Sequence, residues 1–129
     1  MPLSAGYVLL VEDDDAIRQL VSSLLRETGL RVQEAADAAQ ALRFCSGAGG
    51  APGLIILDLG MPAMDGESLL DMIRQQYGWQ APVLILSAMH PAMLESAAQR
   101  MKARAMSKPF DLDDLVAVVH EMLGSSKAP

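Results

Sequence analysis

The sequence has a single cysteine, Cys45, so an internal disulfide bond is excluded and a reducing compartment is the expected setting. Aromatic residues make up only 4% of the chain, and no stretch approaches the ~20 apolar residues of a membrane-spanning helix. Basic residues are also scarce, because 10 Lys and Arg face 16 Asp and Glu, for a formal net charge of −6. Without excess cations to neutralise phosphates, nucleic acids and anionic membranes are disfavoured as direct partners.

Length and termini predict one cytoplasmic domain. Residues 1–6 lack the basic start and the apolar run of a signal peptide, so we expect a cytoplasmic protein. A chain of 129 residues with 51% hydrophobic composition can form one ordinary core. We expect a domain over residues 1–124 and a flexible tail or linker stub over 125–129.

Three apolar tetrads predict buried strands. They are VLLV at 8–11, LIIL at 54–57 and VLIL at 83–86. Each is short, contains β-branched residues and does not alternate with polar residues, which is typical of parallel strands covered by helices on both faces. Weaker patterns predict two further strands, over 31–35 and near 103–106.

Segments with a helical period lie between these strands. In residues 15–28 apolar side chains recur at i, i+3, i+4, i+7 and i+8, and residues 112–123 repeat the pattern. Asp14 and Asp15 lie at the start of the first of these helices, where Asp is favoured at the N-cap and in the first turn. The remaining expected elements are helices over 37–45, 67–77 and 92–101 and a loop over 47–53. This alternation predicts a doubly wound α/β fold with a five-stranded parallel sheet.

Polar side chains follow the predicted strands, at the edge where such sheets bind ligands. Glu12 and Asp13 follow the first strand, and Asp58 ends the third. Ser87 closes the fourth strand, and Lys108 follows the fifth. Carboxylates ~4 Å apart repel by ~4 kcal/mol per pair at an effective dielectric of about 20, so the cluster takes up protons or a cation. The three acids therefore predict a Mg²⁺ site at which the ion would also bind a phosphoryl oxygen.

Four motifs in this order resemble the receiver domain of response regulators in two-component signalling, of the chemotaxis-regulator type. They are VLLVEDD at 8–14, LIILDLGMPAMDG at 54–66, LSA at 86–88 and SKPF at 107–110. The resemblance covers residues 7 to about 123 and implies a flavodoxin-like (βα)5 fold with strand order 2-1-3-4-5. It implies a phosphorylated signalling domain that catalyses only its own phosphotransfer and dephosphorylation, rather than an enzyme acting on other substrates.

The resemblance also implies roles for the acidic residues and the loop after them. Asp58 resembles the phospho-acceptor, Asp13 the direct Mg²⁺ ligand, and Glu12 a ligand that acts largely through water. Gly60 stands where a backbone carbonyl binds the metal. These roles agree with elementary chemistry, because a carboxylate can attack a phosphoryl group once nearby positive charge cancels the repulsion between anions.

Two further residues resemble the part of the site that senses the phosphoryl group. Ser87 resembles the hydroxyl residue that moves to bond a phosphoryl oxygen. Lys108 resembles the lysine that pairs with the phosphoryl group, and the resemblance implies a cis peptide bond to Pro109. Residues 61–62 and 65–66 match the turn that shapes the loop after the acceptor.

The implied partners are proteins. A sensor histidine kinase or a histidine phosphotransfer protein is the expected phosphodonor. A homodimer through the fourth helix, fifth strand and fifth helix is possible in this family, and neither direct nucleic-acid binding nor membrane binding is expected. The cognate kinase and the output remain open.

One position departs from the family pattern. Most receiver domains carry Tyr or Phe three residues before the lysine, whereas this sequence has Ala105. Our hypothesis is that the phosphorylation chemistry is intact and the aromatic readout is absent or delegated. His90, three residues past Ser87, could supply a replacement ring; Met106 is less suited, because adjacent strand residues point to opposite faces.

Two other functions compete with this interpretation. A Mg²⁺-dependent phosphatase or phosphotransferase with an aspartyl nucleophile would use a similar sheet, but such enzymes typically place a second acid two residues after the nucleophile. Gly60 stands there, which disfavours turnover on phosphate esters. A receiver-like binding module that ignores phosphorylation is the other alternative, and Ala105 is its best support.

Overall fold

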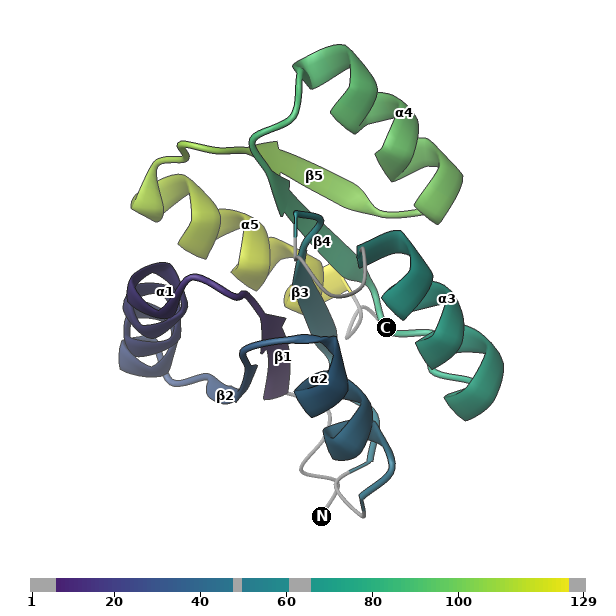
Figure 1. The fold of residues 1–129 in the computed structure, drawn as a ribbon. Helices are drawn as coiled ribbons and strands as arrows, with labels where there is room; N and C mark the ends of the chain where they lie inside the picture. The colour runs from purple at the N-terminus through teal and green to yellow at the C-terminus, as the bar shows by residue number, and fades with distance from the viewer. Residues whose placement is uncertain (1–6, 48–49, 61–65, 126–129) are drawn as a thin grey trace.

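The computed structural model describes residues 7–47, 50–60 and 66–125, and strands and helices alternate along it (Figure 1). The elements are β1 (Tyr7–Val11), α1 (Asp15–Glu27), β2 (Arg31–Ala35), α2 (Ala38–Cys45), β3 (Leu54–Asp58), α3 (Gly66–Tyr77), β4 (Val83–Ser87), α4 (Pro91–Met101), β5 (Arg104–Ser107) and α5 (Leu112–Ser125). All pairings in the five-stranded sheet are parallel, in the order β2-β1-β3-β4-β5. The predicted fold class and strand order are confirmed.

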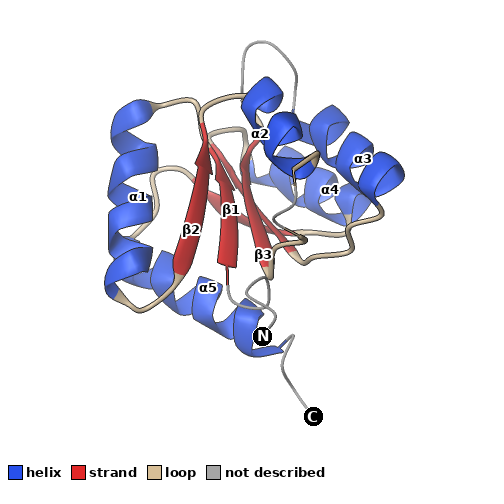
Figure 2. Ribbon diagram, turned by 90° about the horizontal axis from the view of Figure 1, so that it is seen from below, coloured by secondary structure: helices blue, strands red, loops and turns tan. Residues whose placement is uncertain are grey.

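Helices cover both faces of the sheet. Helices α1 and α5 lie on one face, and α2, α3 and α4 lie on the other (Figure 2). All five residues in each of β1, β3 and β4 are buried. Burial on both faces explains why these strands have no polar alternation in the sequence.

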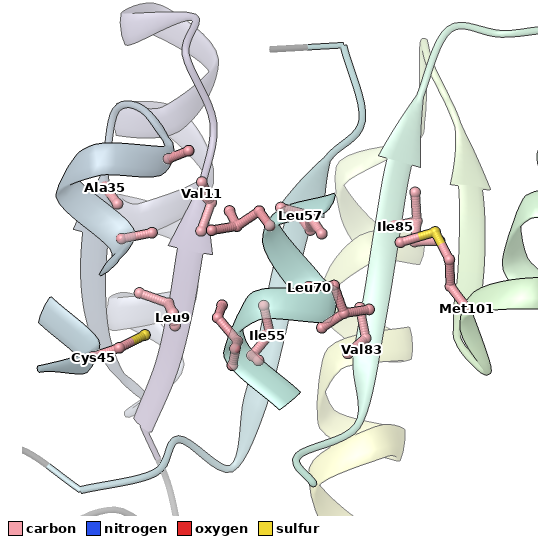
Figure 3. Packing of buried hydrophobic residues seen from close by; sticks show 14 of the residues in the cluster. Leu9, Val11, Ala35, Cys45, Ile55, Leu57, Leu70, Val83, Ile85 and Met101 are labelled. Atoms are coloured by element: carbon pink, nitrogen blue, oxygen red, sulfur yellow. The ribbon is translucent and has the colours of Figure 1, made fainter. Parts of the chain in front are cut away.

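Successive residues of the central strands enter two separate cores. Leu9 and Val11 belong to the core under α2, α3 and α4, where Figure 3 shows them beside Ile55 and Leu57 of β3. The intervening residue Leu10 belongs to the core under α1 and α5. Burying each of these aliphatic side chains contributes about 1.5–3 kcal/mol to the stability of the fold. The central strands are therefore well anchored, and they position the residues at their carboxyl ends.

Short polar interactions set where the helices begin. Asp14 is the N-cap of α1, and its Oδ1 accepts a hydrogen bond from the backbone N–H of Ile17 at 3.0 Å. The capping interpretation of Asp14 is therefore confirmed. Asp15 lies in the first turn, as expected, and also forms an ion pair with Arg18 at 2.7 Å. Helix α1 is followed by Gly29, whose φ of +94° favours glycine.

The carboxyl-terminal elements extend slightly beyond their predicted limits. Strand β5 forms at Arg104–Ser107 despite its weak β-propensity, because parallel pairing with β4 supplies the hydrogen bonds. Helix α5 reaches Ser125, two residues beyond the predicted end at 123. The expected turn residues 61–62 and 65, part of the 47–53 loop and the end of the tail lie outside the described residues. None of the helices within the described ranges has both the length and the apolar character needed to cross a bilayer.

Candidate functional site

The register of the sheet brings the ends of distant strands to one level. Val11 pairs with Leu57, so the residues that follow them, Glu12 and Asp58, lie side by side at the carboxyl edge. Ser87 pairs with Ser107 at the ends of β4 and β5, which places Lys108 at the same edge. The segments that the sequence separates by up to 96 residues therefore meet there.

Three carboxylates form the centre of the site. Glu12, Asp13 and Asp58 each offer an oxygen, and these atoms all lie within 4.8 Å of one another. Glu12 and Asp58 are buried, with 1% and 6% of their surface exposed, whereas Asp13 is exposed. The predicted acidic cluster is present in the structure, and it is accessible from the Asp13 side.

The positive charge of Lys108 partly balances the negative charges of the buried Glu12 and Asp58 carboxylates. Its Nζ lies 3.0 Å from Glu12 Oε1 and 3.6 Å from Asp58 Oδ1. Its backbone N–H donates to the carbonyl of Ser87 at 2.8 Å, which ties the lysine to the end of β4. The Lys108–Pro109 peptide bond is cis, as the resemblance implied. A cation is thus held next to Asp58 by three separate contacts.

The environment shifts the pKa of both Glu12 and Lys108 upward. Burial raises the pKa of Glu12, and the hydrogen bond from Lys108 offsets part of that rise. For Lys108 burial acts to lower the pKa, but its hydrogen bonds to Glu12 and Asp58 and the negative charges of both carboxylates together outweigh burial and raise it. The ammonium therefore stays protonated at neutral pH and supplies a permanent positive charge to the site.

Backbone N–H groups orient the Asp58 carboxylate and the Ser87 hydroxyl. The N–H of Gly60 donates to Asp58 Oδ1 at 3.1 Å, which places Gly60 beside the carboxylate. The hydroxyl of Ser87, which is 5% exposed, accepts from the N–H of Met89 at 3.1 Å. Ser87 lies one residue beyond Leu86, the partner of Asp58 in the register, so both polar side chains belong to one sheet edge.

The donor atoms fit a small hard cation. Oxygen ligands ~2.1 Å from Mg²⁺ lie about 3 to 4.2 Å from one another in an octahedron, a spacing that the acidic cluster can supply. Both oxygens of Glu12 already accept hydrogen bonds, from Lys108 and from the N–H of Asp14. Asp13 and Asp58 are therefore better suited than Glu12 to contact such a cation directly.

Ala105 and His90 lie away from the acidic cluster. Ala105 faces the core under α2, α3 and α4, whereas Met106 packs against the opposite core, as expected for adjacent strand residues. A hollow of about 360 Å³ lies between α4 and β5, and Ala105 is among the small residues that line it. His90 is exposed and caps α4, with its Nδ1 accepting from the N–H of Ala92 at 3.1 Å.

Two features of the site were not identified from the sequence. Arg18 donates to the backbone carbonyl of Glu12 at 3.0 Å. An apolar groove of about 490 Å³ lies beside Lys108, between Leu20 of α1 and Phe110. Leu20 is one of the apolar positions of the helical pattern in α1, yet it is exposed, so it is the residue by which the sequence could have indicated the groove. No local pattern in the sequence indicates the hydrogen bond from Arg18.

Comparisons with known proteins match one family over most of the chain. The family model described as "Response regulator receiver domain" matches residues 8–120. The sensor kinase CckA of Brucella abortus (strain 2308) is 34% identical over 92% of this chain, and NtrC of Escherichia coli (strain K12), a DNA-binding transcriptional regulator, is 32% identical over 94%. The chain spans only 13% and 25% of those relatives. The receiver domain of the Francisella response regulator 1452 superposes with a TM-score of 0.84 at 29% identity, covering 94% of this chain and 98% of that one.

The pairing of Lys108 with buried Glu12 predicts a stability effect. We expect Lys108→Met to lower the free energy of unfolding by about 1–3 kcal/mol, because the buried Glu12 carboxylate loses its nearest cation. Adding Glu12→Gln should restore most of that loss. Lys102→Met, at an exposed position with the same change in charge, is the control. Urea denaturation without Mg²⁺ measures the difference, and equal losses for Lys108→Met and Lys102→Met would contradict the pairing.

Proposed function

The chain belongs to the response regulator receiver domain family of two-component signalling, and from this membership we propose that it accepts a phosphoryl group on Asp58. Receiver domains are signalling domains that interact with histidine kinases or phosphotransfer proteins. The observation that carries the proposal is the meeting of Asp13, Asp58 and Lys108 at one sheet edge. We take residues 1–124 as the receiver domain, and a cytoplasmic location remains a prediction.

The proposed reaction forms an acyl phosphate. An oxygen of Asp58 attacks the phosphorus of a phosphohistidine, the P–O bond forms, and the P–N bond breaks with its electron pair leaving on the imidazole. Asp13 and Asp58, together with the backbone carbonyl of Gly60 and with Glu12 through water, would hold Mg²⁺, which would supply positive charge against the phosphoryl group. Lys108 supplies a second positive charge 3.6 Å from Asp58 Oδ1. The Gly60 N–H holds the same carboxylate oxygen in place.

Phosphorylation is proposed to act on Ser87 and Lys108. The acyl phosphate carries more negative charge than the Asp58 carboxylate, so it attracts the hydroxyl of Ser87 and the ammonium of Lys108. Ser87 Oγ now accepts from the Met89 N–H, at the start of the loop to α4. A reorientation of that hydroxyl would break the bond to Met89 and could therefore shift the loop that leads to α4.

We predict that Mg²⁺ and acetyl phosphate add one phosphoryl group to the protein and that Asp58→Asn abolishes the addition. Asp71→Asn, on the exposed face of α3, is the matched control and should be phosphorylated like wild type. Chelating Mg²⁺ with EDTA should prevent the reaction. Intact-protein mass spectrometry measures each outcome. Repeated turnover of phosphate esters would instead favour the phosphatase, and the absence of any adduct would favour the phosphorylation-independent binding module.

The apolar groove beside Lys108 is proposed as the contact surface for the protein phosphodonor. A donor must bring its phosphorus to Asp58, so it has to cover the surface next to Lys108. That surface is the groove between α1 and Phe110, which includes Lys108 itself. Leu20 projects there with 51% of its surface exposed, a feature that suits an apolar partner surface.

We predict that Leu20→Glu slows phosphotransfer from a protein donor at least tenfold, because it places a charge in the contact, while acetyl phosphate still phosphorylates the variant. The donor is a purified sensor kinase or phosphotransfer protein chosen by its transfer to wild type. Met93→Glu alters the other large exposed hydrophobic residue among those described, 63% exposed on α4, and should leave transfer unchanged. An equal effect on both donors, or an equal effect of Met93→Glu, would exclude this surface.

The hollow beside Ala105 supports the hypothesis that the aromatic readout is absent or delegated. No aromatic ring occupies the 105 position, and residues of α4 and β5 line the space beside Ala105. The ring of His90 is engaged in capping α4, so a role as replacement would require that bond to break. A homodimer through α4, β5 and α5 remains a proposal, and it would cover this hollow.

We predict that Ala105→Tyr changes the self-association of the beryllofluoride-treated protein, because the added ring fills the hollow or projects into the proposed dimer surface. Sedimentation velocity with and without beryllofluoride measures the change. Unaltered sedimentation of the variant would mean that position 105 carries no signal. If wild type and variant both stay monomeric, the homodimer proposal fails.

A further inference from the structure

The side chain of Arg18 is nearly buried at the start of α1, with 12% of its surface exposed. Each of its guanidinium nitrogens contacts a different group. Nη1 donates to the backbone carbonyl of Glu12 at 3.0 Å, Nη2 to Asp15 Oδ1 at 2.7 Å, and Nε to Glu34 Oε1 at 3.3 Å. Because the guanidinium is planar and its donors point in fixed directions, these contacts together define its position.

Glu34, on β2, is itself held from α1. Its Oε2 accepts from the hydroxyl of Ser22 at 2.9 Å and lies 3.3 Å from Arg26 Nη1. The buried polar or charged residues in the described part of the chain are Glu12, Asp58, Ser87 and Ser22. The first three belong to the candidate site, so Ser22 is the buried polar group that the site does not use. Ser22 holds the carboxylate of Glu34 by a hydrogen bond, and that carboxylate in turn accepts a hydrogen bond from Arg18.

The carbonyl that Arg18 holds belongs to the peptide bond between Glu12 and Asp13. A peptide unit is planar, so fixing its oxygen also fixes the nitrogen and Cα of Asp13. The N–H of Glu12 is bonded to the carbonyl of Ala35 at 3.1 Å, which secures the other side of Glu12. Among the described residues, none forms a hydrogen bond to the exposed carboxylate of Asp13. The direction of that carboxylate therefore depends on its backbone.

We infer that Arg18 is a positioning residue, which holds the Glu12–Asp13 peptide plane and so directs the Asp13 carboxylate into the proposed Mg²⁺ site. Glu34 and Ser22 keep the guanidinium in place. The inference rests on the proposed function, since it assigns how one ligand of that site is oriented. Partners that orient metal ligands typically change metal affinity by about 10–100-fold when they are removed.

Charge and positioning predict opposite effects of removing this arginine. A guanidinium near a divalent cation repels it, so by charge alone the loss of Arg18 would tighten Mg²⁺ binding. By positioning, the same loss frees the Glu12–Asp13 peptide to rotate and weakens binding. The sign of the change in affinity therefore separates the two effects.

The experiment compares Arg18→Gln with Arg26→Gln. Both remove one arginine from α1 and both remove a contact to Glu34, but Arg26 otherwise donates to the carbonyl of Val32 and does not touch Glu12. Isothermal titration with MgCl2 should give about tenfold weaker binding for Arg18→Gln. Arg26→Gln should stay within about twofold of wild type. Arg18→Lys keeps the charge without the planar set of donors and should also weaken binding.

A second measurement does not depend on the metal. The ¹⁵N amide signal of Asp13 reports on the peptide unit whose carbonyl Arg18 binds, so it should shift in metal-free Arg18→Gln and stay in place in Arg26→Gln. Thermal unfolding of each variant checks that the domain is folded.

Each outcome has a distinct meaning. Weaker Mg²⁺ binding and a shifted Asp13 signal in the Arg18 variants alone would support the positioning role. Unchanged or tighter binding in folded Arg18→Gln would overturn it while leaving the proposed function intact. If wild type itself fails to bind Mg²⁺, the proposed function fails and this inference fails with it.

Discussion

The pairing of a buried glutamate with a single lysine holds the site together. Glu12 is 1% exposed, and Lys108 Nζ, 3.0 Å away, is its compensating cation. A second buried carboxylate, Asp58, lies 3.6 Å from the same nitrogen, and the exposed Asp13 completes the acidic cluster. One ammonium faces three carboxylates, so the site retains an excess of negative charge that favours a divalent cation. The proposed phosphoryl chemistry depends on that excess.

The parallel sheet makes this arrangement possible. Strands β1, β3 and β4 are buried along their whole length, and their register places Glu12 and Asp58 level with each other. Polar groups can then stand at the end of each strand without interrupting either core. The contacts of Arg18 with Glu12 and Glu34 extend this arrangement outward to β2. The site is therefore supported from both the centre and one edge of the sheet.

The opposite edge of the sheet has a different character. Beyond Ser87, β5 and α4 border a hollow of about 360 Å³, and Ala105 is among the residues that line it. His90 uses its ring to cap α4. The groups proposed for phosphorylation lie together at the carboxyl edge of the sheet, whereas Ala105 lines the α4–β5 hollow.

Much of the fold could be predicted from local patterns. The unalternated tetrads at 8–11, 54–57 and 83–86 predict strands buried on both faces, and the helical stripes predict what covers them. The predicted bounds of β5 and of the end of α5 were less accurate. Ala105 and its neighbours have low intrinsic β-propensity, and they form a strand because they pair with β4. An element can be predicted from the sequence when its apolar residues recur with the period of a strand or a helix. Where that pattern is weak, pairing with neighbouring elements determines whether it forms.

The same division applies to the site. The sequence by itself determined the chemical types at the strand ends, because the polar residue that follows each apolar run must emerge at the carboxyl edge of a parallel sheet. Only the tertiary structure decided that Arg18 reaches the carbonyl of Glu12, that Glu34 and Ser22 hold it there, and that Ala105 borders a hollow. Those contacts join segments through strand register and helix packing, which no local spacing of residues records.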